Sequence, residues 1–156
     1  MKIVLLTVGK TDVPWVKAGL DMYSERLAHY VRFELKEIPE LKNAGALSEA
    51  QIKEKEGALI LKAAGSSEII LLDEHGREFR SVEFADELRK RLNRGGRDLV
   101  YVVGGAYGFS DEVYAAASSS ISLSKMTFSH QMVRTIFAEQ LYRAFTIMKG
   151  EPYHHE

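Results

Sequence analysis

Two uninterrupted apolar runs constrain the fold of this chain most strongly. They are "EIILLD" (68–73) and "LVYVVGG" (99–105), and both end in polar residues or glycine. Runs of this length are too short for a typical helix, and their lack of alternation is typical of strands covered on both faces. Ser81 can cap a helix reaching about Asn93 between them. The three segments together predict a strand–helix–strand unit of a parallel sheet.

The same alternation of strand and helix patterns continues along the whole chain. Further strands are expected at Lys2–Val8, Phe33–Ile38 and the short "ISLS" (121–124), while "EHGRE" (74–78) is expected to form a turn. Helices are expected after a cap at Asp12, from Ser48 with Gln51 in a capping box to about Ala64, after Ser110, and from about His130 to Met148. No linker divides this pattern. It predicts a single α/β domain over residues 1–156, with a mainly parallel sheet.

Composition excludes several classes of protein. Hydrophobic residues make up 46% and charged residues 28%, which argues against disorder, and the absence of cysteine excludes disulfide scaffolds and cysteine-based zinc sites. The apolar N-terminal segment is short and is followed by Gly9 and Lys10, so we expect a soluble, cytoplasmic protein without a membrane span. A net charge of −1 gives no general attraction to nucleic acid, so an RNA partner would require a local basic face.

Ligands of parallel sheets bind beyond the carboxyl ends of the strands. Three such ends carry unusual residues here, after Leu72, after Val103 and after Leu123. Asp73 could bond a ribose or act as a base, or it could simply begin a turn. His75 is expected to be a solvated turn residue, because no further metal ligands lie nearby at useful spacing, and no metal site is predicted.

The glycine-rich segment "VVGGAYGF" (102–109) follows one of the buried strands. Its G-G-x-x-G spacing differs from the dinucleotide fingerprint and from a phosphate-binding P-loop. Glycines such as Gly104 and Gly105 let backbone approach a ligand closely, and they also serve tight turns. Both a ligand wall and a plain turn remain open from this segment.

The last helix and the tail form another candidate region. The helix carries a polar stripe with Tyr142 and Arg143, which is either a solvated face or, with Arg134, suited to phosphate or base contact. Ser129 or His130 stands at its start, where free amides attract anions. The tail "PYHHE" (152–156) is either a frayed end or a cover for a site, with groups for stacking and proton transfer.

Taken in order, these segments resemble a known family. "LLDEHG", "VVGGAYG", "SLSKMTFSHQMVR", "AEQLYRA" and "PYHHE" together resemble the small SPOUT methyltransferases named the ribosomal RNA large subunit methyltransferase H family. The resemblance covers the whole chain, including "MKI" and the spacing of Trp15, Tyr23 and Arg26. It implies a C-terminal trefoil knot, a homodimer with the active site at its interface, and S-adenosylmethionine-dependent methylation of N3 of a pseudouridine in 23S ribosomal RNA. The near-neutral charge favours an assembled ribosome over free RNA as the target.

The resemblance also implies roles for individual residues. The cofactor would be contacted in the knot by Leu72, Gly104, Gly105, Leu123, Ser124, Lys125, Met126, Thr127 and Phe128. The catalytic candidates, which we do not rank, are His130, Arg134, Tyr142 and His154. Arg143, Tyr153 and His155 would contact the substrate; His155 stands where the family carries Arg or Lys, and the tail would reach the partner's pocket.

Two rival functions remain. One is a nucleotide-dependent oxidoreductase of the doubly wound type, which the missing first-strand glycine fingerprint disfavours. The other is a non-catalytic RNA-binding module with a vestigial pocket.

Overall fold

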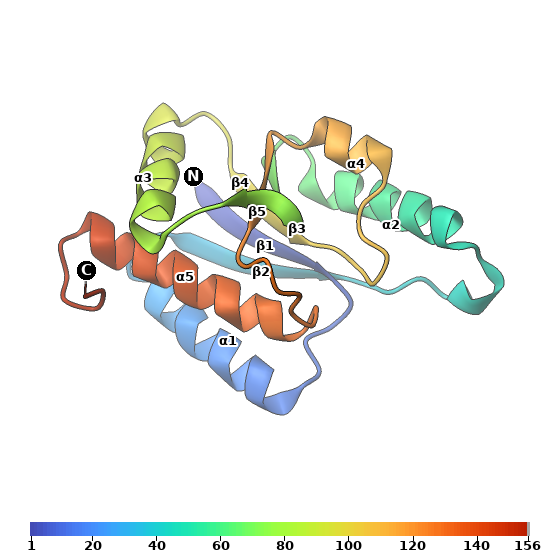
Figure 1. The fold of residues 1–156 in the computed structure, drawn as a ribbon, viewed down its shortest axis with the longest axis horizontal. Helices are drawn as coiled ribbons and strands as arrows, with labels where there is room; N and C mark the ends of the chain where they lie inside the picture. Colours follow the sequence, from blue (N-terminus) through green and yellow to red (C-terminus); the bar gives the residue numbers. More distant parts are fainter. Residues whose placement is uncertain (156) are drawn as a thin grey trace.

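Five parallel strands form one sheet in the computed structural model, which describes residues 1–155 (Figure 1). The strands are β1 (Lys2–Val8), β2 (Arg32–Ile38), β3 (Glu68–Glu78), β4 (Leu99–Val103) and β5 (Ser119–Ser122). Their order across the sheet is β2-β1-β4-β3-β5, and every neighbouring pair is parallel. The predicted α/β class with a mainly parallel sheet is therefore confirmed.

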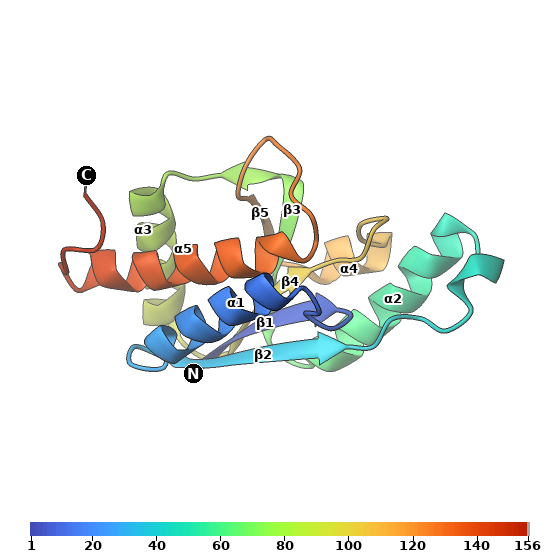
Figure 2. The ribbon, with the colours of Figure 1, turned by 90° about the horizontal axis from the view of Figure 1, so that it is seen from below.

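Helices cover both faces of this sheet. They are α1 (Pro14–Leu27), α2 (Glu49–Ala64), α3 (Ser81–Arg94), α4 (Asp111–Ala116) and α5 (Met132–Met148), with a 3₁₀ turn at Ala44–Ala46. One apolar cluster joins the sheet to α1, α3 and α5, and a second joins its other face to α2 and α4. The pairing of α1 with α5 on one side and the position of α2 on the other are visible in Figure 2. The molecule is a three-layer α/β/α sandwich.

The two central strands are buried on both faces, which explains their unbroken apolar sequences. In β1, Leu5 belongs to the cluster under α1, α3 and α5, whereas Leu6 belongs to the opposite cluster, and both are 0% exposed. In β4, Tyr101 packs on Phe137 of α5 with ring centroids 4.7 Å apart. Successive side chains of a strand point to opposite faces of the sheet. Where helices cover both faces, nearly every position of the strand is therefore apolar.

Two of the predicted helix caps are present in the structure, and two are not. The capping box of Ser48 and Gln51 is present, and the Ser110 hydroxyl accepts a hydrogen bond from the Val113 amide. The expected cap at Asp12 is wrong, because α1 starts at Pro14 and Val13 is the residue at its N-cap. The backbone N–H of Asp12 donates to the Gln131 side chain instead. Ser81 is the first residue of α3 rather than its cap.

The predicted turn at 74–78 is also wrong, because β3 continues through it to Glu78. The strand pairs with β5 twice, and the register shifts between Leu72 and Arg77. At Gly76, between the two paired stretches, a Cβ would lie 2.7 Å from backbone atoms of Ser120 and Ile121. Only glycine permits this close passage of one strand over the other.

Candidate functional site

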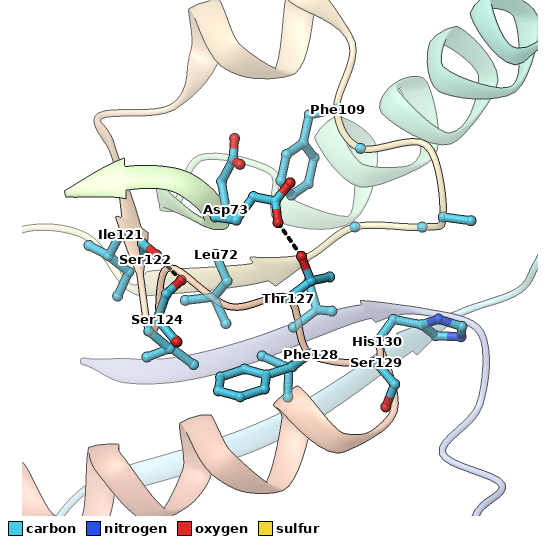
Figure 3. A pocket seen from close by; sticks show the side chains of 18 of the residues that line it. Leu72, Asp73, Phe109, Ile121, Ser122, Ser124, Thr127, Phe128, Ser129 and His130 are labelled. Carbon is cyan, nitrogen blue, oxygen red and sulfur yellow. Dashed lines mark hydrogen bonds between the residues drawn. The ribbon is translucent and has the colours of Figure 1, made fainter. Parts of the chain in front are cut away.

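A pocket of about 360 Å³ lies where β4 and β5 end, beside residues 72–74 in the middle of β3 (Figure 3). The loop between β5 and α5 closes it from the other side. Most residues that the resemblance assigns to a cofactor line it: Leu72, Gly104, Gly105, Leu123, Ser124, Met126, Thr127 and Phe128. Lys125 does not line the pocket, since its side chain is 87% exposed and faces Glu78 at 4.0 Å.

The glycine-rich segment after β4 is both a turn and a wall of this pocket. Its turn is closed by a hydrogen bond of 3.2 Å from the Gly108 amide to the Gly105 carbonyl, and Gly108 has a φ of +81°. A Cβ on Gly104 would lie 2.9 Å from the ring of Phe109, which is 6% exposed. Phe109 also lines the pocket, and sequence reasoning had not singled it out.

The loop before α5 owes its shape to its own hydroxyl groups. The Ser122 hydroxyl donates to the Ser124 carbonyl at 2.8 Å, and the Ser124 hydroxyl accepts from the Met126 amide at 2.9 Å. The Thr127 hydroxyl donates across the pocket to the Glu74 carboxylate at 2.6 Å, as the dashed line in Figure 3 shows. The serine hydroxyls thus bond within the segment itself, and the Thr127 hydroxyl ties the loop to β3.

Asp73 lines the pocket and also accepts two hydrogen bonds from neighbouring groups. One carboxylate oxygen accepts the His75 amide at 3.0 Å, and the other accepts the Tyr114 hydroxyl. Burial and this hydrogen bond raise the pKa of Tyr114 to about 12, so the phenol stays protonated as a donor. The His75 side chain is 83% exposed, as expected of a solvated residue.

Arg134 corrects one expectation outright. Its side chain is 0% exposed, and it donates to the carbonyls of Val8, Gly9 and His130 at 2.9–3.0 Å and to the Thr11 hydroxyl at 2.8 Å. Burial lowers the pKa of the guanidinium, opposed by Glu37 at 3.6 Å. The interpretation that Arg134 is suited to phosphate or base contact is not supported in this chain, because protein oxygens occupy its guanidinium. Its role is to tie the end of β1 to the start of α5.

Two residues of the predicted tail, Tyr153 and His154, form a separate cluster with Glu139, Tyr142 and Arg143 of α5, which we call the C-terminal cluster. The Arg143 guanidinium donates to Glu139 at 2.6 Å and meets the His154 Nδ1 at 3.1 Å, and the Tyr153 hydroxyl donates to Glu139 at 3.0 Å. Hydrogen bonding to Glu139 raises the pKa of Arg143, and burial raises that of Tyr153. His155 is exposed, and Glu156 lies outside the described residues.

The structure does not bring the pocket and the C-terminal cluster together within one chain. His130 lines the pocket at the start of α5, whereas Arg143 lies roughly 20 Å further along the helix at the usual rise per residue. Figure 1 shows the C-terminus at the end of α5 remote from that loop. Of the four catalytic candidates, one lies at the pocket, one is buried and two lie in the C-terminal cluster.

A second pocket, of about 320 Å³, adjoins the first and was not predicted. The two pockets share Gly105, Ala106 and His130. Glu56 lines the second pocket from the stripe of α2 that also carries the buried Ile52 and Ile60. A carboxylate on an otherwise apolar stripe was the sequence signal that could have identified it.

Two further observations concern residues 1–155. No helix among them is long and apolar enough to span a membrane. No group of three or more His, Asp or Glu side chains in the same residues is arranged to hold a metal ion.

Comparisons with known proteins give the family. A family model described as "Predicted SPOUT methyltransferase" matches residues 1–154. Proteins named "Ribosomal RNA large subunit methyltransferase H" are 56% identical over 157 residues in Parabacteroides distasonis, covering 100% of both chains, and 55% identical over 156 residues in Christiangramia forsetii, covering 99% of both.

A solved structure from Haemophilus influenzae, titled as a probable methylase family protein, shares the fold. It has a TM-score of 0.53 and 12% identity, and the match covers 99% of this chain and 70% of that one. The fold match agrees with the full-length sequence matches. The chain therefore belongs to the SPOUT methyltransferases, in the ribosomal RNA large subunit methyltransferase H family.

Proposed function

We propose that this protein transfers a methyl group from S-adenosylmethionine to N3 of a pseudouridine in 23S ribosomal RNA, acting on assembled ribosomes in the cytoplasm. The name of its full-length relatives supports ribosomal RNA as the substrate class. The observation that carries the proposal is the pocket beside residues 72–74 of β3 and the ends of β4 and β5, which gathers residues from three distant parts of the chain. That edge is where parallel sheets bind nucleotide-like ligands.

The lining of the pocket fits such a cofactor. Gly104 and Gly105 bring bare backbone to its wall, Leu72 and Phe109 supply apolar surface, and Asp73 places a carboxylate at the rim within the lining. Backbone and apolar groups can hold an adenine ring, and a carboxylate can accept ribose hydroxyls. S-adenosylmethionine, when bound, supplies a methyl group on a sulfonium. The loop before α5, held by Thr127 and Glu74, orients the ligand and excludes water.

A homodimer would unite the two separated halves of the site. The C-terminal cluster is roughly 20 Å along α5 from the pocket of its own chain, so we propose that Tyr153, His154 and His155 serve the pocket of a second copy. Exposed apolar side chains on α1, with Trp15 62% and Met22 41% exposed seven residues apart, support such a contact.

We also propose that the C-terminal segment is threaded to form a trefoil knot. The close passage of β3 over β5 at Gly76 supports a crossing of this kind. If the two chain ends are joined covalently, a knotted ring should migrate faster in a denaturing gel than an unknotted ring of the same mass. Equal migration would contradict the knot.

The proposed reaction is tested by methyl transfer. The purified protein is incubated with labelled S-adenosylmethionine and with free ribosomal RNA, isolated large subunits or complete ribosomes from cells lacking this enzyme. We expect incorporation into complete ribosomes above all, and digestion to nucleosides should yield N3-methylpseudouridine. Absence of label in all three substrates would contradict the proposal and favour a non-catalytic RNA-binding module. Thermal stabilisation by NAD in preference to S-adenosylhomocysteine would favour the oxidoreductase.

A further inference from the structure

The second pocket lies directly beside the proposed cofactor pocket. Gly105, Ala106 and His130 form the wall between them. Its remaining lining comes from the end of β1, the segment after β2, α2 and the loop after β4: Val8, Glu40, Leu41, Ala44, Gly45, Ile52, Glu56 and Tyr107. Its volume of about 320 Å³ falls within the range of small-molecule sites.

Glu56 holds a position that packing alone does not explain. It lies between Ile52 and Ile60, which are 8% and 1% exposed, and its carboxylate reaches the shared wall. A Cβ on Gly105 would lie 2.5 Å from the Glu56 Oε1 atom. Among residues 1–155, no hydrogen bond or ion pair satisfies this carboxylate. The carboxylate oxygens are not buried and lie in the lining of the second pocket, so a ligand there that donates a hydrogen bond can reach them.

A methyl transfer requires the methyl donor and the acceptor base to lie side by side. The two pockets share lining residues, so ligands bound in them would be neighbours. We propose that the second pocket receives the base to be methylated and that Glu56 takes the proton from its imide nitrogen. Tyr107, which is 48% exposed in the same lining, offers an aromatic face on which a base can stack. This inference rests on the proposed function and adds the acceptor pocket and the base to it.

The step balances without another reactant. The imide nitrogen forms a bond to the methyl carbon while the carbon–sulfur bond breaks, and sulfur keeps the electron pair of that bond. The imide proton passes to the Glu56 carboxylate and then to solvent, leaving an N-methylated base and S-adenosylhomocysteine. Burial and the neighbouring Glu40 raise the pKa of Glu56 above its ordinary value, which makes it a stronger base.

The test compares Glu56→Gln with Glu54→Gln, an exposed carboxylate on the same helix. We expect Glu56→Gln to lower kcat on the ribosomal substrate about 100-fold or more, the usual contribution of a general base. Affinity for S-adenosylhomocysteine, measured by calorimetry, should stay unchanged, and Glu54→Gln should behave as wild type in both assays. A loss of kcat under about threefold, or a parallel loss of S-adenosylhomocysteine affinity, would overturn the assignment.

A second variant keeps the pocket testable if Glu56→Gln fails to fold. Ala44→Phe places a ring in the second pocket from the 3₁₀ turn, away from the first pocket. It should abolish methyl transfer or raise KM for the ribosomal substrate, while S-adenosylhomocysteine binding persists. Normal transfer by this variant would show that the acceptor does not enter the second pocket.

The pH profile separates a base from a structural carboxylate. The titratable groups that line the same pocket are Glu40, from the segment after β2, Tyr107, from the loop after β4, and His130, from the loop before α5. In wild type, kcat should fall toward low pH as the base becomes protonated; we call this fall the acidic limb. All three other groups are kept in Glu56→Gln, so loss of the acidic limb in this variant would support the inference. If wild type transfers no methyl group at all, the proposed function fails; if it does and the acidic limb persists in Glu56→Gln, only the inference fails.

Discussion

Arg134 shows how one buried cation organises the carboxyl edge of the sheet. Its guanidinium donates to carbonyls at the end of β1 and to the carbonyl of His130, which lines both pockets. A charge with 0% exposure is tolerated because carbonyl and hydroxyl oxygens surround it, with Glu37 at 3.6 Å. The residue therefore positions His130 rather than contacting a ligand.

Replacing Arg134 should unfold the protein readily. Arg134→Met removes a donor from the Val8 carbonyl and the Thr11 hydroxyl and leaves the Gly9 carbonyl only the Thr7 hydroxyl at 3.2 Å, so we expect a loss of about 3 kcal/mol or more in the free energy of unfolding. Arg89→Met, which removes an exposed ion pair with Asp86, should cost less than about 1 kcal/mol. Urea denaturation measures both. Equal costs would contradict the buried role of Arg134.

At the scale of elements, the crossing of β3 over β5 shapes the pocket. The second half of β3 is carried past β5, so Asp73 and Glu74 lie at the pocket rim, where Glu74 holds Thr127 of the loop before α5. The crossing depends on Gly76, because its neighbours on β5 are backbone atoms. Backbone held in a sheet cannot move aside as the end of a side chain can.

Substitution at Gly76 should therefore be costly. Gly76→Ala places a Cβ 2.7 Å from the backbone of β5, and we expect a loss of about 2 kcal/mol or more in unfolding free energy. Gly45→Ala is the matched control, since a Cβ there meets no atom within 4 Å, and it should change stability by less than about 0.5 kcal/mol. Thermal and urea unfolding give both values. A neutral Gly76→Ala would show that the two strands can separate.

The tail is anchored by a hydrogen bond that depends on pH. The Tyr30 hydroxyl donates to the Glu151 carboxylate at 2.6 Å, and this bond raises the pKa of Tyr30 from 10.0 to about 12. The folded state therefore favours the protonated phenol. Its contribution to stability is complete below pH 10 and is lost as the pH rises to about 12. Between these values wild type should lose more stability than Tyr30→Phe in urea titrations; parallel pH profiles would contradict the anchor.

The sequence predicted the elements and their order better than it predicted strand ends or long-range contacts. The unbroken apolar runs of β3 and β4 and the serine caps at Ser48 and Ser110 indicated the fold, because these signals are local. The extension of β3 was missed because "EHGRE" has the residues of a turn, and only β5 gives it a partner. Arg134 was misplaced because its acceptors on β1 lie more than 120 residues away in the sequence.

For the whole molecule, the main observation is that the pocket and the C-terminal cluster lie at opposite ends of α5. The pocket opens at its start and the C-terminal cluster lies near its end. In a symmetric dimer, each copy can supply to its partner what its own fold holds too far away. If the site is shared in this way, each reaction would require two chains, although each chain carries every residue type required.

Mixing two inactive variants tests this division. Ser124→Trp fills the pocket, and His154→Ala removes the imidazole that meets Arg143. Each variant alone should be inactive on ribosomes. Refolded together in equal amounts, they should recover about a quarter of wild-type activity, because half of the dimers are mixed and each of these has one intact site. No recovery, despite mixed dimers confirmed by mass spectrometry, would contradict a shared site.

The bonds of Arg134 have a consequence for synthesis of the chain. The first strand to leave the ribosome is β1. The donor to its Val8 carbonyl is Arg134 of α5, which lies 126 residues later in the sequence. The wall between the two pockets contains His130, which comes from the same late segment. Contacts of such large sequence separation form only after most of the chain has emerged. A nascent chain therefore lacks the Arg134 bonds that hold the end of β1 to His130 until α5 has emerged.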